Sequence, residues 1–261
     1  MNTFLEDRGK GEPVVLAHAG VTDSRIWDLA VPLLLDAGYR VIRYDLPGYG
    51  RSEAPTKPYS LVELALRLLD ESGLEAVHWV GLSQGGATGV DLTLAHPERI
   101  KTLALVAPGL SGYDWPKSVN REAMEAAYLR GDAHGLAVEV LRRWGPMSFA
   151  STGEVLDEPA AKIVLEQAGW FMAEDDFEIE EPSAVDRLGE IRVPTLIVLG
   201  EQDEATITDI GRIYAEGIPG AQSVTLAGAD HLLPLRVPEQ LHPLLLEHLG
   251  RSAGSAPVLP R

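Results

Sequence analysis

Residues 77–89 read VHWVGLSQGGATG, and this short stretch decides the fold. Its first half is a β-rich apolar run, typical of a strand buried on both faces. The chain then passes through GLSQG at residues 81–85 into a helical pattern that begins near Ala87. Glycines two positions before and two positions after Ser83 allow a turn sharp enough to expose its hydroxyl. The stretch predicts a strand–turn–helix unit with Ser83 as a candidate nucleophile; the plainer alternative is a serine that caps the helix.

Similar apolar runs alternate with amphipathic segments along much of the chain. The strand-like runs occupy residues 14–18, 41–45, 77–81, 102–107, 195–200 and 223–228. The helical patterns between and after them occupy residues 26–36, 61–72, 86–96, 207–216 and 238–249. This alternation predicts right-handed βαβ crossovers on a mostly parallel sheet, and therefore an α/β fold.

The alternation stops between residues 112 and 189, where no strand-like run occurs. Helical patterns replace it at residues 118–130, 133–144 and 154–173. We expect this segment to form a helical cap outside the sheet. The predicted organisation is a core over residues 1–111 and 190–250, a cap over residues 112–189, and a loose tail over residues 251–261.

The composition excludes several classes of function. The chain has no cysteine, so disulfides, cysteine nucleophiles and thiolate metal sites are excluded. A formal net charge of −17 disfavours nucleic acid and anionic lipid as partners and favours a neutral or cationic substrate. The N-terminal sequence MNTFLEDRGKGEP lacks the pattern of a secretory signal, and no apolar run is long enough to span a bilayer. We therefore expect a cytoplasmic protein without a membrane partner.

Two polar residues after the last two strand-like runs complete a catalytic set with Ser83. His231 lies on the loop after residues 223–228, and Asp203 lies in the turn after residues 195–200. Both should emerge at the carboxyl edge of the sheet, which makes His231 the candidate general base and Asp203 the acceptor for its Nδ1–H. The chain order Ser, Asp, His fits this assignment. Three nearby acids compete with Asp203 for the role: Glu201, Glu204 and Asp230.

Further pieces of sequence carry a resemblance to a known family. They are HAG at residues 18–20 with Trp27, DLPGYGRS at 45–52, GLSQGG at 81–86, HPERI at 96–100, PTLIVLGEQD at 194–203 and ADHLLPLRVPE at 229–239. On these motifs the chain resembles the α/β-hydrolase superfamily, particularly its capped serine esterases, enol-lactonases and perhydrolases. The resemblance implies a sheet of seven to eight strands flanked by helices, a helical cap after the sixth strand, and hydrolysis with neither a metal nor an organic cofactor.

The resemblance also implies an oxyanion hole. In this family a His-Gly dipeptide precedes the first donor, which assigns the role to the N–H groups of Gly20 and Gln84. This chain has Ala19 where the family has glycine, and alanine tolerates fewer backbone angles. His18 is then a structural residue. The segment before residue 14 is short for the family's N-terminal hairpin, so the first strand is expected to be missing.

We expect the cap to set the choice of substrate. Its apolar side chains are the candidates for a substrate pocket: Trp115, Trp144, Trp170, Phe171, Phe149 and Met172. The sequence predicts a serine hydrolase acting on a small carboxylic ester or lactone. Enol-lactone hydrolysis, perhydrolysis and carbon–carbon bond hydrolysis stay open because the same triad serves them. A non-catalytic ligand-binding protein on this fold also stays open, and so does the oligomeric state, a homodimer included.

Overall fold

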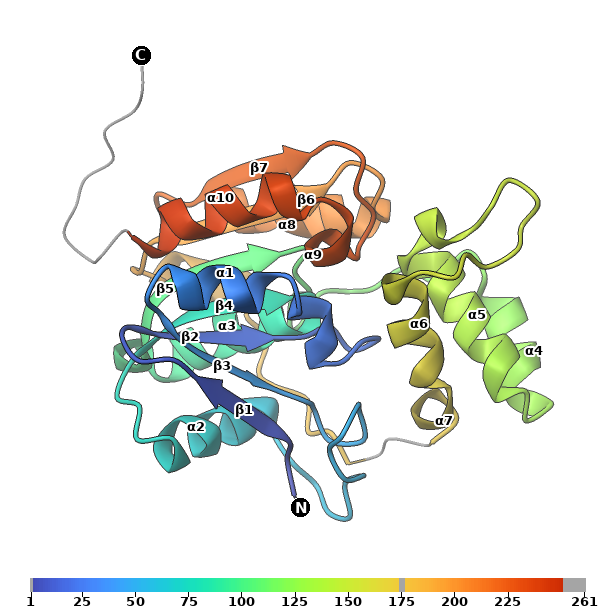
Figure 1. Ribbon diagram of the computed structural model, residues 1–261, viewed down its shortest axis with the longest axis horizontal. Helices are drawn as coiled ribbons and strands as arrows, with labels where there is room; N and C mark the ends of the chain where they lie inside the picture. Colours follow the sequence, from blue (N-terminus) through green and yellow to red (C-terminus); the bar gives the residue numbers. More distant parts are fainter. Residues whose placement is uncertain (1, 174–176, 251–261) are drawn as a thin grey trace.

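A computed structural model describes residues 2–173 and 177–250 of the chain. The strands of this part form one seven-stranded sheet in the order β1-β3-β2-β4-β5-β6-β7 (Figure 1). β1 pairs antiparallel with β3, and the other neighbouring strands pair in parallel. The strands are β1 (Leu5–Arg8), β2 (Pro13–Ala17), β3 (Arg40–Tyr44), β4 (Val77–Leu82), β5 (Ile100–Val106), β6 (Thr195–Gly200) and β7 (Gln222–Leu226). The predicted α/β fold with a mostly parallel sheet is confirmed.

The direction of each crossover determines which face of the sheet its helix covers. The chain moves from β2 to β3 in one direction, and from β3 to β4, β4 to β5 and β6 to β7 in the other. Because such crossovers are right-handed, α1 covers one face while α2, α3 and α8 cover the other. The last helix, α10, packs against α1. The helices of the core are α1 (Ala30–Asp36), α2 (Leu61–Glu71), α3 (Gln84–Ala95), α8 (Ala205–Gly217), α9 (Leu233–Arg236) and α10 (Pro238–Leu249).

The reversal of direction lies between the neighbouring strands β2 and β4. Open α/β sheets bind ligands in the crevice outside the carboxyl ends of the strands at such a reversal. The register pairs Ala17 with Gly81, so the loop after β2 and the turn after β4 leave the sheet side by side. Every residue of β4 and β6 is buried, as their continuous apolar sequences predict. The sheet is therefore a rigid base for the loops that it carries.

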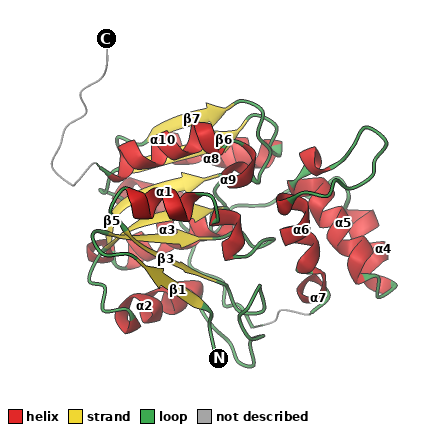
Figure 2. Cartoon of the chain, viewed as in Figure 1, coloured by secondary structure: helices red, strands yellow, loops and turns green. Residues whose placement is uncertain are grey.

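The chain between β5 and β6 forms a group of helices, which lies beside the carboxyl edge of the sheet (Figure 2). Its helices are α4 (Arg121–Leu129), α5 (Ala133–Trp144), α6 (Pro159–Glu166) and α7 (Ala168–Phe171). Two helices, α6 and α7, thus replace the single helix predicted over residues 154–173. The first of them begins only at Pro159, whose fixed φ suits a first helical residue. Four short 3₁₀ segments complete the described part: Ser24–Trp27, Pro97–Arg99, Pro146–Ser148 and Val185–Glu190.

Two details of the predicted strand count are resolved. One antiparallel strand, β1, precedes β2 where the family has a hairpin, which gives seven strands and not eight. The helical group therefore follows the fifth strand in chain order and not, as was predicted, the sixth. The number differs because one strand of the family's N-terminal hairpin is missing from the sheet. The tail predicted over residues 251–261 lies outside the described residues. No helix of the described part is long and apolar enough to cross a membrane.

Candidate active site

Ser83 occupies a strained turn between β4 and α3. Its φ of 52° and ψ of −112° are angles that a non-glycine residue rarely adopts and that cost about 1–3 kcal/mol. The neighbouring glycines make the turn sterically feasible. A Cβ on Gly81 would lie 2.2 Å from the Gly85 carbonyl oxygen, and one on Gly85 would lie 2.5 Å from the Ala17 carbonyl oxygen. Ser83 therefore holds a strained backbone conformation. The turn places this residue in the wall of a cavity.

His231 and Asp203 form a buried pair above the ends of β6 and β7. The Nδ1 atom of His231 lies 2.9 Å and 3.1 Å from the two carboxylate oxygens of Asp203. Each side chain is 1% exposed, so water does not compete for the contact. The carboxylate accepts from Nδ1–H, which leaves Nε2 as the proton acceptor of the ring. His231 lines the same cavity as Ser83.

The three competing acids are all engaged elsewhere. Glu201 accepts a hydrogen bond from the Gly228 N–H at 3.2 Å. Glu204 pairs with Arg143 of the helical group, with contacts of 2.8 Å and 3.1 Å. Asp230 is fully buried and accepts from the Arg236 Nε at 3.1 Å. Among these candidates only Asp203 contacts the histidine ring in the described structure.

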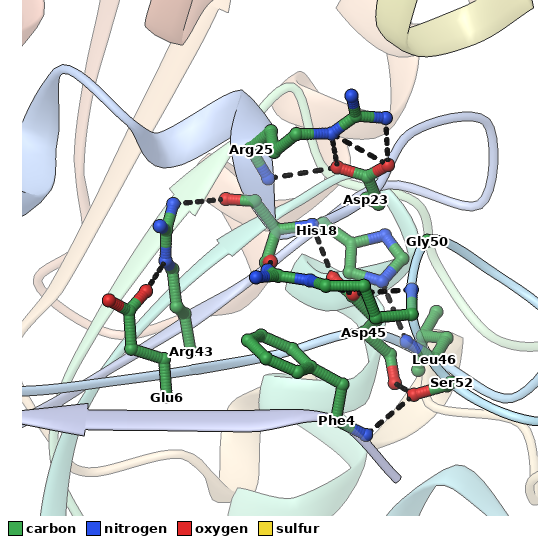
Figure 3. A network of polar contacts seen from close by, with 12 residues as sticks. Phe4, Glu6, His18, Asp23, Arg25, Arg43, Asp45, Leu46, Gly50 and Ser52 are labelled. Carbon is green, nitrogen blue, oxygen red and sulfur yellow. Dashed lines mark hydrogen bonds and ion pairs between the residues drawn. The ribbon is translucent and has the colours of Figure 1, made fainter. Parts of the chain in front are cut away.

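A buried histidine fixes the first oxyanion-hole candidate. The Leu46 N–H donates to His18 Nε2 at 2.8 Å (Figure 3), so that nitrogen carries no proton. The Nδ1–H of His18 then donates to the Ala19 carbonyl, also at 2.8 Å. In a trans peptide the carbonyl and the following N–H point in opposite directions. Fixing the Ala19 carbonyl therefore also fixes the direction of the Gly20 N–H. Burial lowers the pKa of His18, which keeps the ring neutral for this role.

The loop over residues 45–52 holds Gly20 from the other side. The buried Asp45 carboxylate accepts from the Ser24 and Arg51 N–H groups, each at 2.9 Å, which shapes this loop (Figure 3). The loop presents the Tyr49 hydroxyl, which donates to the Gly20 carbonyl at 2.5 Å. Gly20 is thus restrained on both of its peptide units.

The second candidate donor, the N–H of Gln84, belongs to a residue that packs on Gly20. A Cβ on Gly20 would lie 2.7 Å from the Gln84 Oε1, so only glycine fits there without movement. The Gln84 Nε2 donates to both carboxylate oxygens of Glu178, each at 3.0 Å. Gly20, Gln84, Glu178 and Ser83 all line one cavity, which brings the two candidate N–H donors and the candidate nucleophile together.

The cavity measures about 980 Å³ and lies between the sheet edge and the helical group. Trp115 and Trp144 line it, and the ring centroids of Trp144 and His231 are 4.5 Å apart. Four aromatic or apolar residues expected at the pocket do not line this cavity: Trp170, Phe171, Phe149 and Met172.

The structure gives a packing reason for two of these corrections. Gly48 has a φ of 85°, and a Cβ there would lie 2.3 Å from the Trp170 ring. Trp170 therefore packs the helical group against the loop at Gly48 and Tyr49 instead of lining the cavity. The Arg142 guanidinium lies over the Phe149 ring, with its Cζ atom 4.5 Å from the ring centroid.

Several polar residues of the cavity were not expected from the sequence. Among them are Tyr49, Asp91 and Glu178. Asp91 did carry a signal, because it is a charged residue within the apolar helical run GVDLTLA at residues 89–95. Glu178 gave none, because it follows the helical group in a segment with neither helical nor strand periodicity.

Comparisons with known proteins identify the family of the chain. A model described as "Alpha/beta hydrolase family" matches residues 14–243. A 2-hydroxy-6-oxononadienedioate/2-hydroxy-6-oxononatrienedioate hydrolase from Cupriavidus pinatubonensis is 29% identical over 94% of this chain and 89% of its own length. A hydrolase structure from Pseudomonas aeruginosa has a TM-score of 0.77 and 29% identity, covering 95% of this chain and 94% of that one. The enol-lactonase from Burkholderia xenovorans has a TM-score of 0.73 and 26% identity, covering 95% and 96%. The chain belongs to the alpha/beta hydrolase family and is a hydrolase.

Proposed function

We propose that this hydrolase cleaves small carboxylic esters or lactones through an acyl-enzyme on Ser83. His231 takes the serine proton as Oγ attacks the carbonyl and later activates the water that releases the acyl group. Asp203 holds the ring in one tautomer and stabilises the imidazolium. The observation that carries the proposal is the two-oxygen contact of Asp203 with His231 Nδ1, which is buried from water, together with the strained turn that places Ser83 in the cavity that His231 also lines.

The oxyanion that forms on attack needs donors placed in advance. The N–H groups of Gly20 and Gln84 are proposed for this role, because charge on the oxygen appears only in the transition state and each such donor contributes about a hundred- to thousandfold in rate. Support comes from the hydrogen bonds that restrain Gly20 through Ala19 and Tyr49. None of these steps requires a metal ion or an organic cofactor.

Carbon–carbon bond hydrolysis is the less favoured use of the same residues. The relative from Cupriavidus pinatubonensis has a name that specifies a dioate, a doubly anionic compound. Among the described residues, five carboxylates and one arginine line the cavity of this chain, which disfavours a second anionic end. Ester and lactone hydrolysis place no such demand, and the neighbour named an enol-lactonase keeps lactones in the proposal.

The proposal is tested with p-nitrophenyl esters from acetate to decanoate and a panel of small lactones. Wild type should hydrolyse some of them, Ser83→Ala none, and a fluorophosphonate probe should label wild type alone. Asp203→Asn should lower kcat by about a thousandfold or more, because the histidine loses the partner that sets its tautomer. Asp209→Asn, which removes the same charge from the exposed face of α8, is the matched control. Failure of the probe to label wild type would favour a ligand-binding protein, and loss of activity in Glu204→Gln alone would reassign the acid.

A further inference from the structure

The wall of the active-site cavity has an unbalanced charge. In the part of the chain that the structure describes, five carboxylate residues line it: Asp91, Asp114, Glu178, Glu180 and Glu181. Arg143 is the cationic residue of the described lining, and its guanidinium is engaged by Glu204 outside the cavity wall. A group of acids alone does not define a binding site. Here, however, the acids share one cavity with Ser83 and His231, where a substrate must lie during the proposed reaction.

Asp91 is the most informative of these acids. It is 7% exposed, lines the cavity, and accepts one hydrogen bond, from the Ser111 hydroxyl to Oδ2 at 2.6 Å. Its Oδ1 accepts from no described residue, and no ion pair forms with it in the described structure. Burial, helped by the charge of Glu181, raises the pKa of Asp91 to about 7 although the Ser111 hydroxyl and the more distant Arg187 oppose the change. A buried carboxylate without a cation is costly, and a cation from a ligand would remove that cost.

Glu181 adds a second carboxylate to the same region. Its Oε1 accepts from the Ser60 hydroxyl at 2.6 Å and from the Val62 N–H at 3.2 Å, so this oxygen caps the start of α2. Its Oε2 accepts from no described residue, and no described cation pairs with it. Capping explains one oxygen of Glu181 and leaves the other available to a ligand.

Helix α3 places Asp91 at a defined distance from the nucleophile. Gln84, Ala87, Thr88 and Asp91 line the cavity and repeat every three to four residues, so one face of α3 forms its floor. Asp91 is eight residues beyond Ser83, which corresponds to about 12 Å along the helix axis. A substrate with its carbonyl at Ser83 therefore reaches Asp91 with the far end of a medium-length chain.

We propose, on the basis of the serine-hydrolase function proposed above, that the substrate of this enzyme carries an alkylammonium group that binds against Asp91 and Glu181. Aromatic rings in the lining, among them Tyr113, Trp115 and Trp144, suit the methyl or methylene groups of such a cation. The negative cavity wall also raises the local concentration of cationic substrates and lowers that of anionic ones.

The first test compares p-nitrophenyl esters of equal length whose acyl chains end in trimethylammonium, tert-butyl or carboxylate. The expected order of kcat/KM is cation, neutral, anion, with at least a tenfold preference for the cation over its neutral isostere, equivalent to about 1.4 kcal/mol. Alkyltrimethylammonium ions and their tert-butyl isosteres are then compared as inhibitors of acetate ester hydrolysis, which covers a cation on the alcohol side. A preference for the cation in either series supports the proposal, and its absence from both overturns it.

The second test assigns the preference to the two acids. Asp91→Asn and Glu181→Gln should each lower the cation-to-neutral ratio several-fold, whereas Asp209→Asn should leave it unchanged. Because the ratio is measured within one protein, a lower folded fraction cancels. An unchanged ratio in both cavity variants overturns the assignment. Hydrolysis of the neutral ester by wild type and not by Ser83→Ala tests the serine-hydrolase function on its own. Failure of the cation proposal can then be distinguished from failure of the hydrolase proposal.

Discussion

The buried ion pair of Asp230 and Arg236 joins the loop of His231 to the helical group, and its removal should be costly. Arg236 Nε lies 3.1 Å from Asp230 Oδ1, and the other guanidinium nitrogens contact Glu158 Oε1 at 2.7 Å and Ser148 Oγ at 2.6 Å. The side chain of Arg236 is 8% exposed and that of Asp230 is 0% exposed. Arg236→Met keeps a long apolar stem and removes the charge, which leaves the Asp230 carboxylate buried without a cation.

Loss of one partner from a buried ion pair costs about 3–5 kcal/mol. Two backbone donors remain for Asp230, the N–H groups of Met147 at 3.0 Å and Leu232 at 3.1 Å, so we expect the low end, about 3 kcal/mol. Urea unfolding followed by tryptophan fluorescence measures this loss as a change in the free energy of unfolding.

A matched control separates burial from charge in this experiment. Arg212→Met breaks an exposed i,i+4 pair with Glu216, whose side chains are 59% and 67% exposed, and should cost less than about 0.5 kcal/mol. Adding Asp230→Asn to Arg236→Met should recover part of the loss, since the unpaired charge is then gone. A loss below about 1 kcal/mol in Arg236→Met would refute the reasoning.

Two further predictions concern single groups at the cavity. The folded pKa of Asp91, about 7, lies above the unfolded value near 3.9, so its contribution to stability is complete below about pH 4 and is lost as the pH rises through 7. The Tm of Asp91→Asn should therefore gain on that of wild type between pH 5 and pH 7 and then level off; a constant difference over that range would contradict the burial argument. Tyr49→Phe removes the hydroxyl from the Gly20 carbonyl and should lower kcat about three- to tenfold with little change in KM, while Tyr39→Phe should change neither. A change in KM alone would mean that Tyr49 binds substrate and does not restrain Gly20.

Much of the fold follows from local sequence. The strand–turn–helix unit around Ser83 was predictable because both its apolar strand and its glycine spacing lie within a dozen residues, and the same holds for the strands before Asp203 and His231. The edge strand β1 was not predicted, because three of the four residues in the run LEDR at Leu5–Arg8 are charged and only its pairing with β3 makes it a strand. Local patterns report strands buried on both faces far better than short edge strands.

The cavity wall was harder to predict, for a physical reason. Which face of a cap helix points toward the sheet depends on contacts between residues far apart in the chain. Trp144 lies against His231, whereas Trp170 lies against Gly48, and nothing in the sequence around either tryptophan distinguishes them. Asp230 shows the same limit: its position beside His231 suggested a competing acid, but its carboxylate is committed to Arg236 and the Met147 N–H.

The place where the helical group enters the chain has an evolutionary consequence. The proposed nucleophile, oxyanion donors, acid and base follow β4, β2, β6 and β7, whereas the helical group follows β5, which carries none of them. Of the parallel strands β2 and β4 to β7, four thus lead into proposed catalytic residues, and β5 leads into the helical group. Natural variation or engineering can exchange the inserted helices at that junction to obtain a new substrate range, while the inherited reaction centre keeps its geometry.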